Sequence, residues 1–259
     1  MLTVADISHH QGKIDWNAFA PAIDAVIIKA GGGDGRDVPF YEDSTFRRNR
    51  DVARRRALPR WYYYFAGCRS SGRREADHFL TLVPDVSDEE GLALDYEPAV
   101  PPQDPAAWCA EFIGRVKHVT GKACLFYTNE NRVLTHDWQP VVDTCGGLWV
   151  AKYGKNDGFP HTPPKTGQWP RAAAWQYTSK KQMPGVTENT VDMNQYFGDV
   201  AQFRAHGSPG PLAGLGEDRL RELVREATAD VFNGKARRVR GITSWDRYLQ
   251  VLLDASRKN

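Results

Sequence analysis

The sequence has few cysteines, and their spacing does not indicate a metal or redox site. Its 259 residues include four, Cys68, Cys109, Cys124 and Cys145, and no two of them form the C-x-x-C pattern of zinc knuckles and redox pairs. We expect mostly buried free thiols; a disulfide between two of them is the alternative.

The sequence also lacks a large excess of charge and any long apolar run. The formal net charge of +2 and the pI near 8.3 are too mild to predict a nucleic-acid partner. No segment approaches the length of a membrane span, and no basic-then-apolar stretch precedes Thr3. We therefore expect neither a membrane partner nor a cleaved secretion signal.

Cofactor-binding patterns are missing as well. The glycine-rich segment at 31–35 does not have the spacing of a phosphate-binding loop. His9 and His10 are adjacent, so on a strand they would point to opposite faces and could not share a metal. The sequence therefore predicts neither a metal nor a cofactor.

Short apolar segments alternate with amphipathic ones along most of the chain, which predicts an α/β fold. Eight strands in such an order are typical of a modified (β/α)8-like barrel. After residue 149 the connections are rich in Gly and Pro, so we expect the last strands to be joined by loops, with an antiparallel arrangement as one alternative. The predicted strands are 2–7, 25–30, 61–66, 91–97, 123–127, 148–153, 172–177 and 190–193, and the clearest predicted helices are 44–57, 72–82 and 104–121.

The end of the chain differs in composition from the rest. A Gly- and Pro-rich stretch begins at residue 207, and two amphipathic helices are predicted after it. The sequence thus predicts a catalytic barrel at 1–206, a linker at 207–214 and a small α-helical C-terminal module at 215–259.

Carboxylates stand at the ends of several predicted strands. On a strand, Asp95 and Glu97 share one face and lie about 7 Å apart. Asp6 ends the first predicted strand and Asp192 lies on the last, and a barrel brings these two strands together. Carboxylates crowded in a partly dry site acquire different pKa values, as glycoside hydrolysis requires. The alternative is that all four are solvated turn or capping residues.

Several motifs, in order along the chain, resemble the family 25 glycoside hydrolases, which are N-acetylmuramidases and include many phage lysozymes. Two features depart from the family: Gly31-Gly32 stands where Thr-Glu is usual, and Tyr64 replaces a common His. The motifs that carry the resemblance are Asp6-Ile7-Ser8, Gln11-Gly12, Ile14-Asp15-Trp16, Ile27-Ile28-Lys29-Ala30, Tyr63-Tyr64-Phe65, Asp95-Tyr96-Glu97, Trp175-Gln176-Tyr177 and Val191-Asp192-Met193-Asn194.

The resemblance implies cleavage of the β-1,4 bond between N-acetylmuramic acid and N-acetylglucosamine in peptidoglycan. It implies that Glu97 is the general acid, that Asp95 assists through the substrate's N-acetyl group, and that Asp6 and Asp192 orient the sugar. The substrate-binding residues expected on the same basis are Lys29, Tyr63, Tyr64, Tyr127, Trp149, Trp175 and Gln176. Among them, the rings of Tyr63, Tyr127, Trp149 and Trp175 could stack on sugars.

The C-terminal module faintly resembles a short helical cell-wall-binding repeat of phage lysins. This layout favours a phage endolysin that resides in the host cytoplasm before its release to the wall. Two alternatives stay open at this point: a silent peptidoglycan-binding protein on the same scaffold, and a hydrolase of another N-acetylhexosamine polymer such as chitin. Neither the host nor the oligomeric state follows from the sequence.

Overall fold

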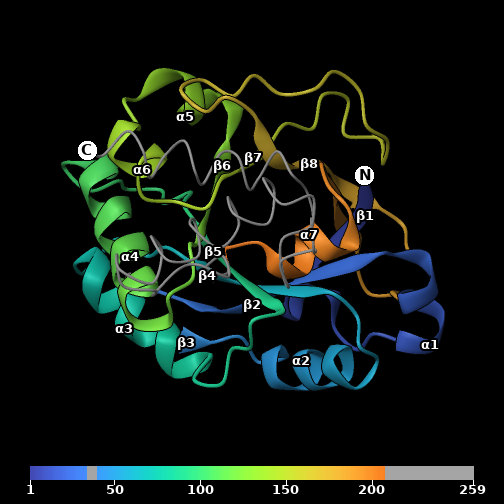
Figure 1. Ribbon diagram of the computed structural model, residues 1–259. Coiled ribbons are helices and arrows are strands. Elements are labelled where there is room, and N and C mark those ends of the chain that lie inside the picture. Colours follow the sequence, from blue (N-terminus) through green and yellow to red (C-terminus); the bar gives the residue numbers. More distant parts are fainter. Residues whose placement is uncertain (34–39, 208–259) are drawn as a thin grey trace, which may run out of the picture. The chain divides into compact units, whose positions relative to one another are not determined.

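The computed structural model describes residues 1–33 and 40–207 (Figure 1). Nearly all of the predicted linker at 207–214 and the whole predicted helical module at 215–259 lie outside the described residues. The strands are β1 (Leu2–Ile7), β2 (Ala25–Gly32), β3 (Tyr41–Glu42), β4 (Arg60–Phe65), β5 (Glu90–Asp95), β6 (Leu125–Asn129), β7 (Leu148–Ala151), β8 (Ala172–Lys181) and β9 (Val191–Tyr196). The α-helices are α1 (Trp16–Phe19), α2 (Phe46–Arg55), α3 (Gly72–Leu82), α4 (Pro105–Thr120), α5 (Glu130–Thr135), α6 (Gln139–Val142) and α7 (Val200–Ala205), and two 3-10 turns are η1 (His9–Gln11) and η2 (Ala20–Ala22).

Eight of these strands close into a barrel, because β1 pairs with β2 on one side and with β9 on the other. The strands from β1 to β8 run parallel around the barrel, except for the short added strand β3, which pairs antiparallel with β2. β9 is antiparallel to both of its neighbours. The predicted α/β barrel is confirmed. The antiparallel arrangement, given as an alternative for the last strands, is found for β9.

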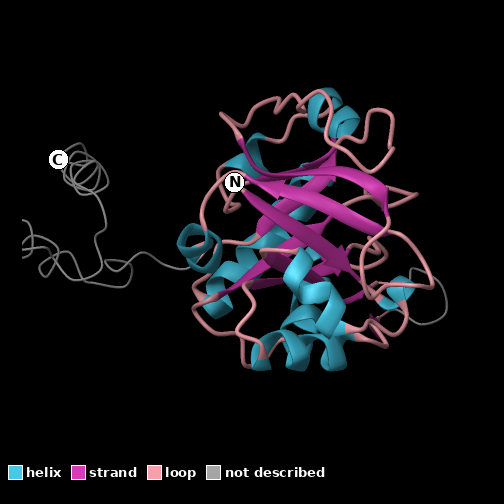
Figure 2. Ribbon diagram, turned by 90° about the vertical axis from the view of Figure 1, so that its right-hand side faces the viewer, coloured by secondary structure: helices cyan, strands magenta, loops and turns pink. Residues whose placement is uncertain are grey.

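The longer helices α2, α3 and α4 lie outside the strands, whereas the connection from β7 to β8 is a long loop (Figures 1 and 2). Helix α4 begins where the sequence predicts: the Asp104 carboxylate accepts the backbone N–H of Ala107 at 2.9 Å, and Pro105 occupies the first turn. It ends at Gly121, which has a φ of +72° that glycine adopts without strain.

The alternation of side chains along each strand builds two apolar layers. In β4, Trp61 and Tyr63 point into the barrel, while Tyr62 and Tyr64 pack outward beneath the helices. Helix α7 closes the barrel end where β4 begins: the Phe203 ring stacks on Trp61 at 4.0 Å, and the Trp61 indole donates to the Phe203 carbonyl at 2.9 Å. The opposite end, where the parallel strands terminate, is left for the site.

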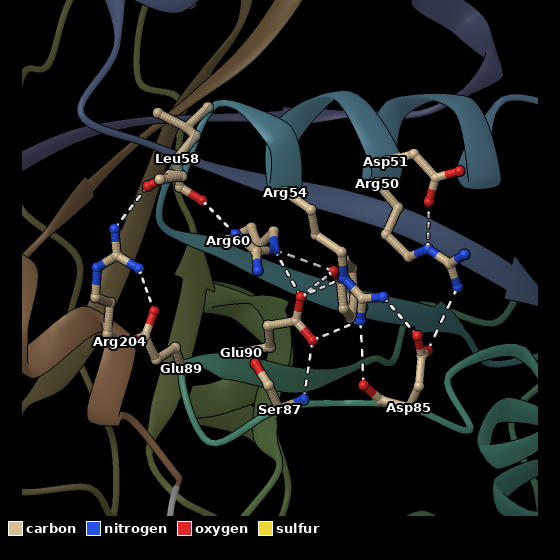
Figure 3. Close-up of polar contacts among 12 residues, drawn as sticks. Arg50, Asp51, Arg54, Leu58, Arg60, Asp85, Ser87, Glu89, Glu90 and Arg204 are labelled. Carbon is tan, nitrogen blue, oxygen red and sulfur yellow. Dashed lines mark hydrogen bonds and ion pairs between the residues drawn. The ribbon is translucent and has the colours of Figure 1, made fainter.

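A buried ion-pair network ties α2 to the start of β4 and β5 (Figure 3). Glu90 has a fully buried side chain and accepts from Arg54, Arg60 and the Tyr62 hydroxyl, at 2.8, 2.6 and 2.6 Å. These bonds outweigh burial and lower the pKa of Glu90 to about 2. Arg54 also pairs with Asp85 at 2.6 Å, so this arginine connects α2 to the body of the barrel.

Candidate active site

A hollow of about 280 Å³ opens at the carboxyl ends of the parallel strands. The four carboxylates singled out in the sequence, Asp6, Asp95, Glu97 and Asp192, all line it. Because β9 runs antiparallel, residues near its amino end reach the same edge, and Asp192 is the direct register partner of Asp6 on β1. Closure of the barrel therefore places two acids, far apart in the sequence, side by side.

Glu97 does not lie on a strand. β5 ends at Asp95, two residues earlier than the predicted strand, and Glu97 stands in the loop that follows. The Arg132 guanidinium of α5 clamps this loop on both sides of Glu97, donating to the Tyr96 carbonyl at 3.3 Å and to the Pro98 carbonyl at 2.8 Å. These two bonds fix the backbone that aims the Glu97 carboxyl into the cleft.

The crowding of these acids changes their proton affinities. Burial, followed by the charge of Asp192, raises the pKa of Asp6 well above its ordinary value, and burial with the Glu97 charge does the same for Asp95. The Glu97 side chain is exposed at the cleft, but partial desolvation by the surrounding protein raises its pKa, opposed by the positive charges of Arg132 and Lys29. The pKa of Asp192 rises to about 6, again through burial and the Glu97 charge. Near neutral pH such a cluster holds protons that isolated carboxylates would release.

Two amides hold Asp6 in place. Its Oδ2 accepts from Gln176 Nε2 at 3.0 Å and from Asn194 Nδ2 at 2.7 Å. The Gln176 oxygen in turn accepts the hydroxyls of Tyr127 and Tyr153, at 2.8 and 2.6 Å. Because its oxygen is engaged on the other side, the Gln176 amide must turn its N–H groups toward Asp6.

Asn194 is fixed in the same way. Its oxygen accepts the Trp149 indole N–H at 2.7 Å, and its side chain is fully buried. Both amides lower the pKa of Asp6, which burial raises. The network therefore fixes the orientation of Asp6 and offsets part of the rise in its pKa.

Five of the seven predicted substrate-binding residues line the cleft: Lys29, Tyr63, Tyr127, Trp149 and Gln176. The other two do not. Tyr64 is fully buried on the outer face of β4, with its hydroxyl 3.2 Å from His78 Nδ1, and Trp175 faces outward on β8 and donates to the Lys152 carbonyl at 2.8 Å. The prediction was wrong for these two because each is the strand neighbour of a residue that points inward, and alternation sends it to the opposite face.

Several residues of the site were not found from the sequence. Asn194 shares a strand face with Asp192 two residues away, so the period of two could have revealed it. No sequence pattern identified Arg132 as a site residue, since it reaches the site from a separate helix. The further cleft-lining residues that the sequence analysis did not assign are Ile7, Ser8, His10, Gln11, Phe65, Tyr153, Ser179, Asn189 and Thr190.

No group of three or more His, Cys, Asp or Glu side chains within residues 1–33 and 40–207 is arranged to hold a metal ion. His9 and His10 lie on the 3-10 turn η1 instead of a strand. His9 Nδ1 lies 2.8 Å from the buried carboxylate of Asp43, and all four cysteines are free thiols. In the described part of the chain, no helix has the length and apolarity to cross a membrane.

A family model described as glycosyl hydrolases family 25 matches residues 5–186, more than two thirds of the chain. The chain belongs to glycosyl hydrolases family 25. The matched segment includes Asp6, Asp95 and Glu97, and Asp192 follows six residues after its end. Family membership confirms the enzyme class predicted from the sequence, a glycoside hydrolase of the lysozyme type.

Solved structures of family 25 enzymes share the fold. The bacterial lysozyme from Streptomyces coelicolor is 26% identical with a TM-score of 0.66, over 80% of this chain and 96% of that one. The catalytic domain of endolysin ply40 from bacteriophage P40 of Listeria monocytogenes is 22% identical with a TM-score of 0.65, over 79% and 98%. A family GH25 lysozyme from Aspergillus fumigatus is 24% identical with a TM-score of 0.61, over 80% and 99%. Among curated protein sequences, none is significantly similar to the chain.

Proposed function

We propose that this family 25 enzyme is an N-acetylmuramidase that hydrolyses the β-1,4 bond between N-acetylmuramic acid and N-acetylglucosamine in bacterial peptidoglycan, with net retention of anomeric configuration. The observation that carries the proposal is the convergence of four carboxyl groups with raised pKa values in one cleft. Aromatic rings of Tyr63, Tyr127 and Trp149 line the same cleft and offer faces for a sugar ring.

Glu97 is the general acid. Partial desolvation in the cleft raises its pKa, so a larger fraction of the Glu97 carboxyl groups carries a proton near neutral pH. Its loop is held by Arg132. The Glu97 proton passes to the glycosidic oxygen as the bond from that oxygen to the anomeric carbon breaks. The leaving sugar then departs as an alcohol, and positive charge develops on the anomeric carbon.

Asp95 assists through the substrate. Its Oδ1 is buried and has no hydrogen-bond partner among the described residues, so it is available to accept the N–H of the substrate's acetamido group. That bond makes the acetamido oxygen a better nucleophile, and this oxygen closes onto the anomeric carbon. Water then opens the resulting ring at the same carbon, with Glu97 taking up the water's proton. Two displacements at one carbon give net retention.

Asp6 and Asp192 orient the sugar at the cleavage position. The amides of Gln176 and Asn194 donate to Asp6 Oδ2 and hold its carboxyl group in a fixed orientation in the cleft. In this role, Gln176 positions a carboxylate as well as lining the cleft.

The biological setting that fits this activity is a phage endolysin, held in the host cytoplasm until it reaches the wall. The catalytic barrel at 1–206 would carry the chemistry, and the predicted module at 215–259 would bind the cell wall. A hydrolase of another N-acetylhexosamine polymer remains the alternative, since the acids of the cleft do not by themselves recognise the lactyl group.

Mass spectrometry of digested, purified peptidoglycan tests the proposal. We expect fragments with N-acetylmuramic acid at the reducing end, and we expect Glu97→Gln to lower the release of reducing ends by at least about 100-fold while the protein still sediments with walls. Fragments ending in N-acetylglucosamine, or unchanged turnover of the variant, would contradict the assigned bond or the role of Glu97. Digestion of chitin at a similar rate would favour the alternative substrate.

A further inference from the structure

A second hollow, of about 840 Å³, lies on the described surface between the turn at α1 and helix α2. Ligand sites in proteins commonly have volumes of about 300–1,000 Å³ with apolar walls and a few placed polar groups. This hollow has both features: apolar side chains line it, and cations surround its opening. Its apolar residues include Ile14, Trp16 and Val52, and its cations are Lys13, Arg55 and Arg56.

The rim of the hollow is positively charged. Three cations and one acid, Asp15, line it, and the Asp15 carboxylate is already engaged in accepting the backbone N–H of Asn17 at 2.9 Å. The side chains of Lys13 and Arg55 are exposed and make no hydrogen bond or ion pair with any other described residue. Their charges are therefore available to an anionic ligand.

The hollow and the catalytic cleft are neighbours, because the same two segments wall both. Gln11 lines the cleft and Lys13 lines the hollow, and on the other segment Thr190 and Thr187 do the same. The segments are cross-linked, since Gln11 Nε2 donates to the Thr190 carbonyl at 2.9 Å and the Asp15 N–H donates to the Gly185 carbonyl at 2.8 Å. Gln11 and Lys13 are two residues apart, so their Cα atoms are at most about 7 Å apart.

Two charges near this boundary oppose one another. The Arg48 guanidinium donates to the Gly12 carbonyl, and the Glu188 carboxylate lies against Gly12. Because the charges of Arg48 and Glu188 offset each other, the net positive charge around the hollow comes from Lys13, Arg55 and Arg56.

We propose that this hollow binds the carboxylates of the short peptide attached to the lactyl group of N-acetylmuramic acid, an inference that rests on the proposed function. A peptide of three or four residues in extended form spans roughly 10–14 Å, which is longer than the two-residue step from Gln11 in the cleft to Lys13 in the hollow. Its carboxylates complement the three cations, and its methyl groups suit the floor of Ile14, Trp16 and Val52. The hollow thus makes the enzyme prefer glycan that carries peptides over bare glycan.

The test compares two substrates and two matched variants. The substrates are peptidoglycan freed of phosphate-containing polymers, either intact or after an amidase has removed its peptides. The first variant, K13Q/R55Q, removes two cations of the hollow. The second, R73Q/K117Q, removes two exposed cations from α3 and α4, whose side chains line neither the cleft nor the hollow. The measured quantity is kcat/KM from the release of reducing ends.

We expect K13Q/R55Q to lower kcat/KM on intact peptidoglycan by about 3- to 10-fold, since exposed ion pairs contribute modestly, and to leave the rate on stripped glycan unchanged. R73Q/K117Q should match the wild-type protein on both substrates. An equal loss on both substrates, or no loss on either, would overturn the proposal. If the wild-type protein cleaves neither substrate, the proposed function fails instead, so the two failures are distinguishable.

Discussion

Replacing Asp192 by Asn should stabilise the protein at neutral pH while impairing its activity. Asp192 is largely buried, lies opposite Asp6 in the β1–β9 ladder and near the Glu97 charge, and its pKa is raised from 3.8 to about 6. In the unfolded chain the same carboxyl is solvated and loses its proton near 3.8. At neutral pH, ionisation of Asp192 is therefore less favourable in the folded state than in the unfolded chain, and this difference lowers the free energy of unfolding.

The magnitude follows from the difference in pKa. Below pH 3.8 both states hold the proton and Asp192 costs nothing. As the pH rises from 3.8 to about 6, the unfolded chain ionises first, so stability falls, and above about pH 6 the loss is constant. At about 1.4 kcal/mol per pKa unit, the loss is roughly 3 kcal/mol, shared with the neighbouring acids. Asparagine has the same shape and no charge, and its oxygen can still accept from Gln176.

Urea unfolding of the wild-type protein and Asp192→Asn between pH 4 and pH 8 measures this effect, with tryptophan fluorescence as the probe. We expect the variant to be more stable by roughly 2–3 kcal/mol at pH 7 and equal to wild type near pH 4, with strongly reduced hydrolysis of peptidoglycan. Glu111→Gln, which neutralises an exposed acid on α4, is the control and should change stability little at any pH. A variant no more stable than wild type at pH 7, or one stabilised equally at pH 4 and pH 7, would refute the argument.

Two further substitutions test other parts of the barrel. Glu90→Gln should destabilise the protein by roughly 3–5 kcal/mol at pH 7, because Arg54 and Arg60 lose their buried partner. Urea midpoints measure this loss of stability. Since the pKa of Glu90 is lowered from 4.5 to about 2, the stability difference between variant and wild type should shrink as the pH falls through that range. Arg132→Gln should lower kcat by about 10-fold, as expected for roughly 1.4 kcal/mol of lost positioning, and should shift the alkaline limb of the pH–rate profile upward, because its positive charge lowers the pKa of Glu97. An unshifted alkaline limb would show that Arg132 does not act through Glu97.

Much of the fold was predictable because it depends on local patterns. Runs such as the one at 25–28 are apolar on both faces, as a strand covered on both sides requires, and Asp104-Pro105 with Gly121 marks the two ends of α4. Strand ends were less predictable: the apolar run before Asp95 identifies β5, but nothing local shows that the strand stops there and leaves Glu97 on a loop.

The four acids of the cleft could be chosen from the sequence because each stands at or near a strand end and the ordered motifs resemble one family. The same reasoning misplaced Tyr64 and Trp175, since a resemblance in sequence does not say which face of a strand a side chain takes. Strict alternation from Tyr63 and Gln176 would have excluded both.

By itself, the sequence determined the order of strands and helices and the residues able to carry the chemistry, because period, capping and residue type are properties of neighbouring residues. Only the tertiary structure decided which of those residues meet. Ring closure between β1, β2 and β9 sets Asp6 opposite Asp192, and packing of α5 brings Arg132 to the loop of Glu97. These contacts join residues more than 30 positions apart. The acids are removed from water, and their pKa values raised, only once the barrel has closed.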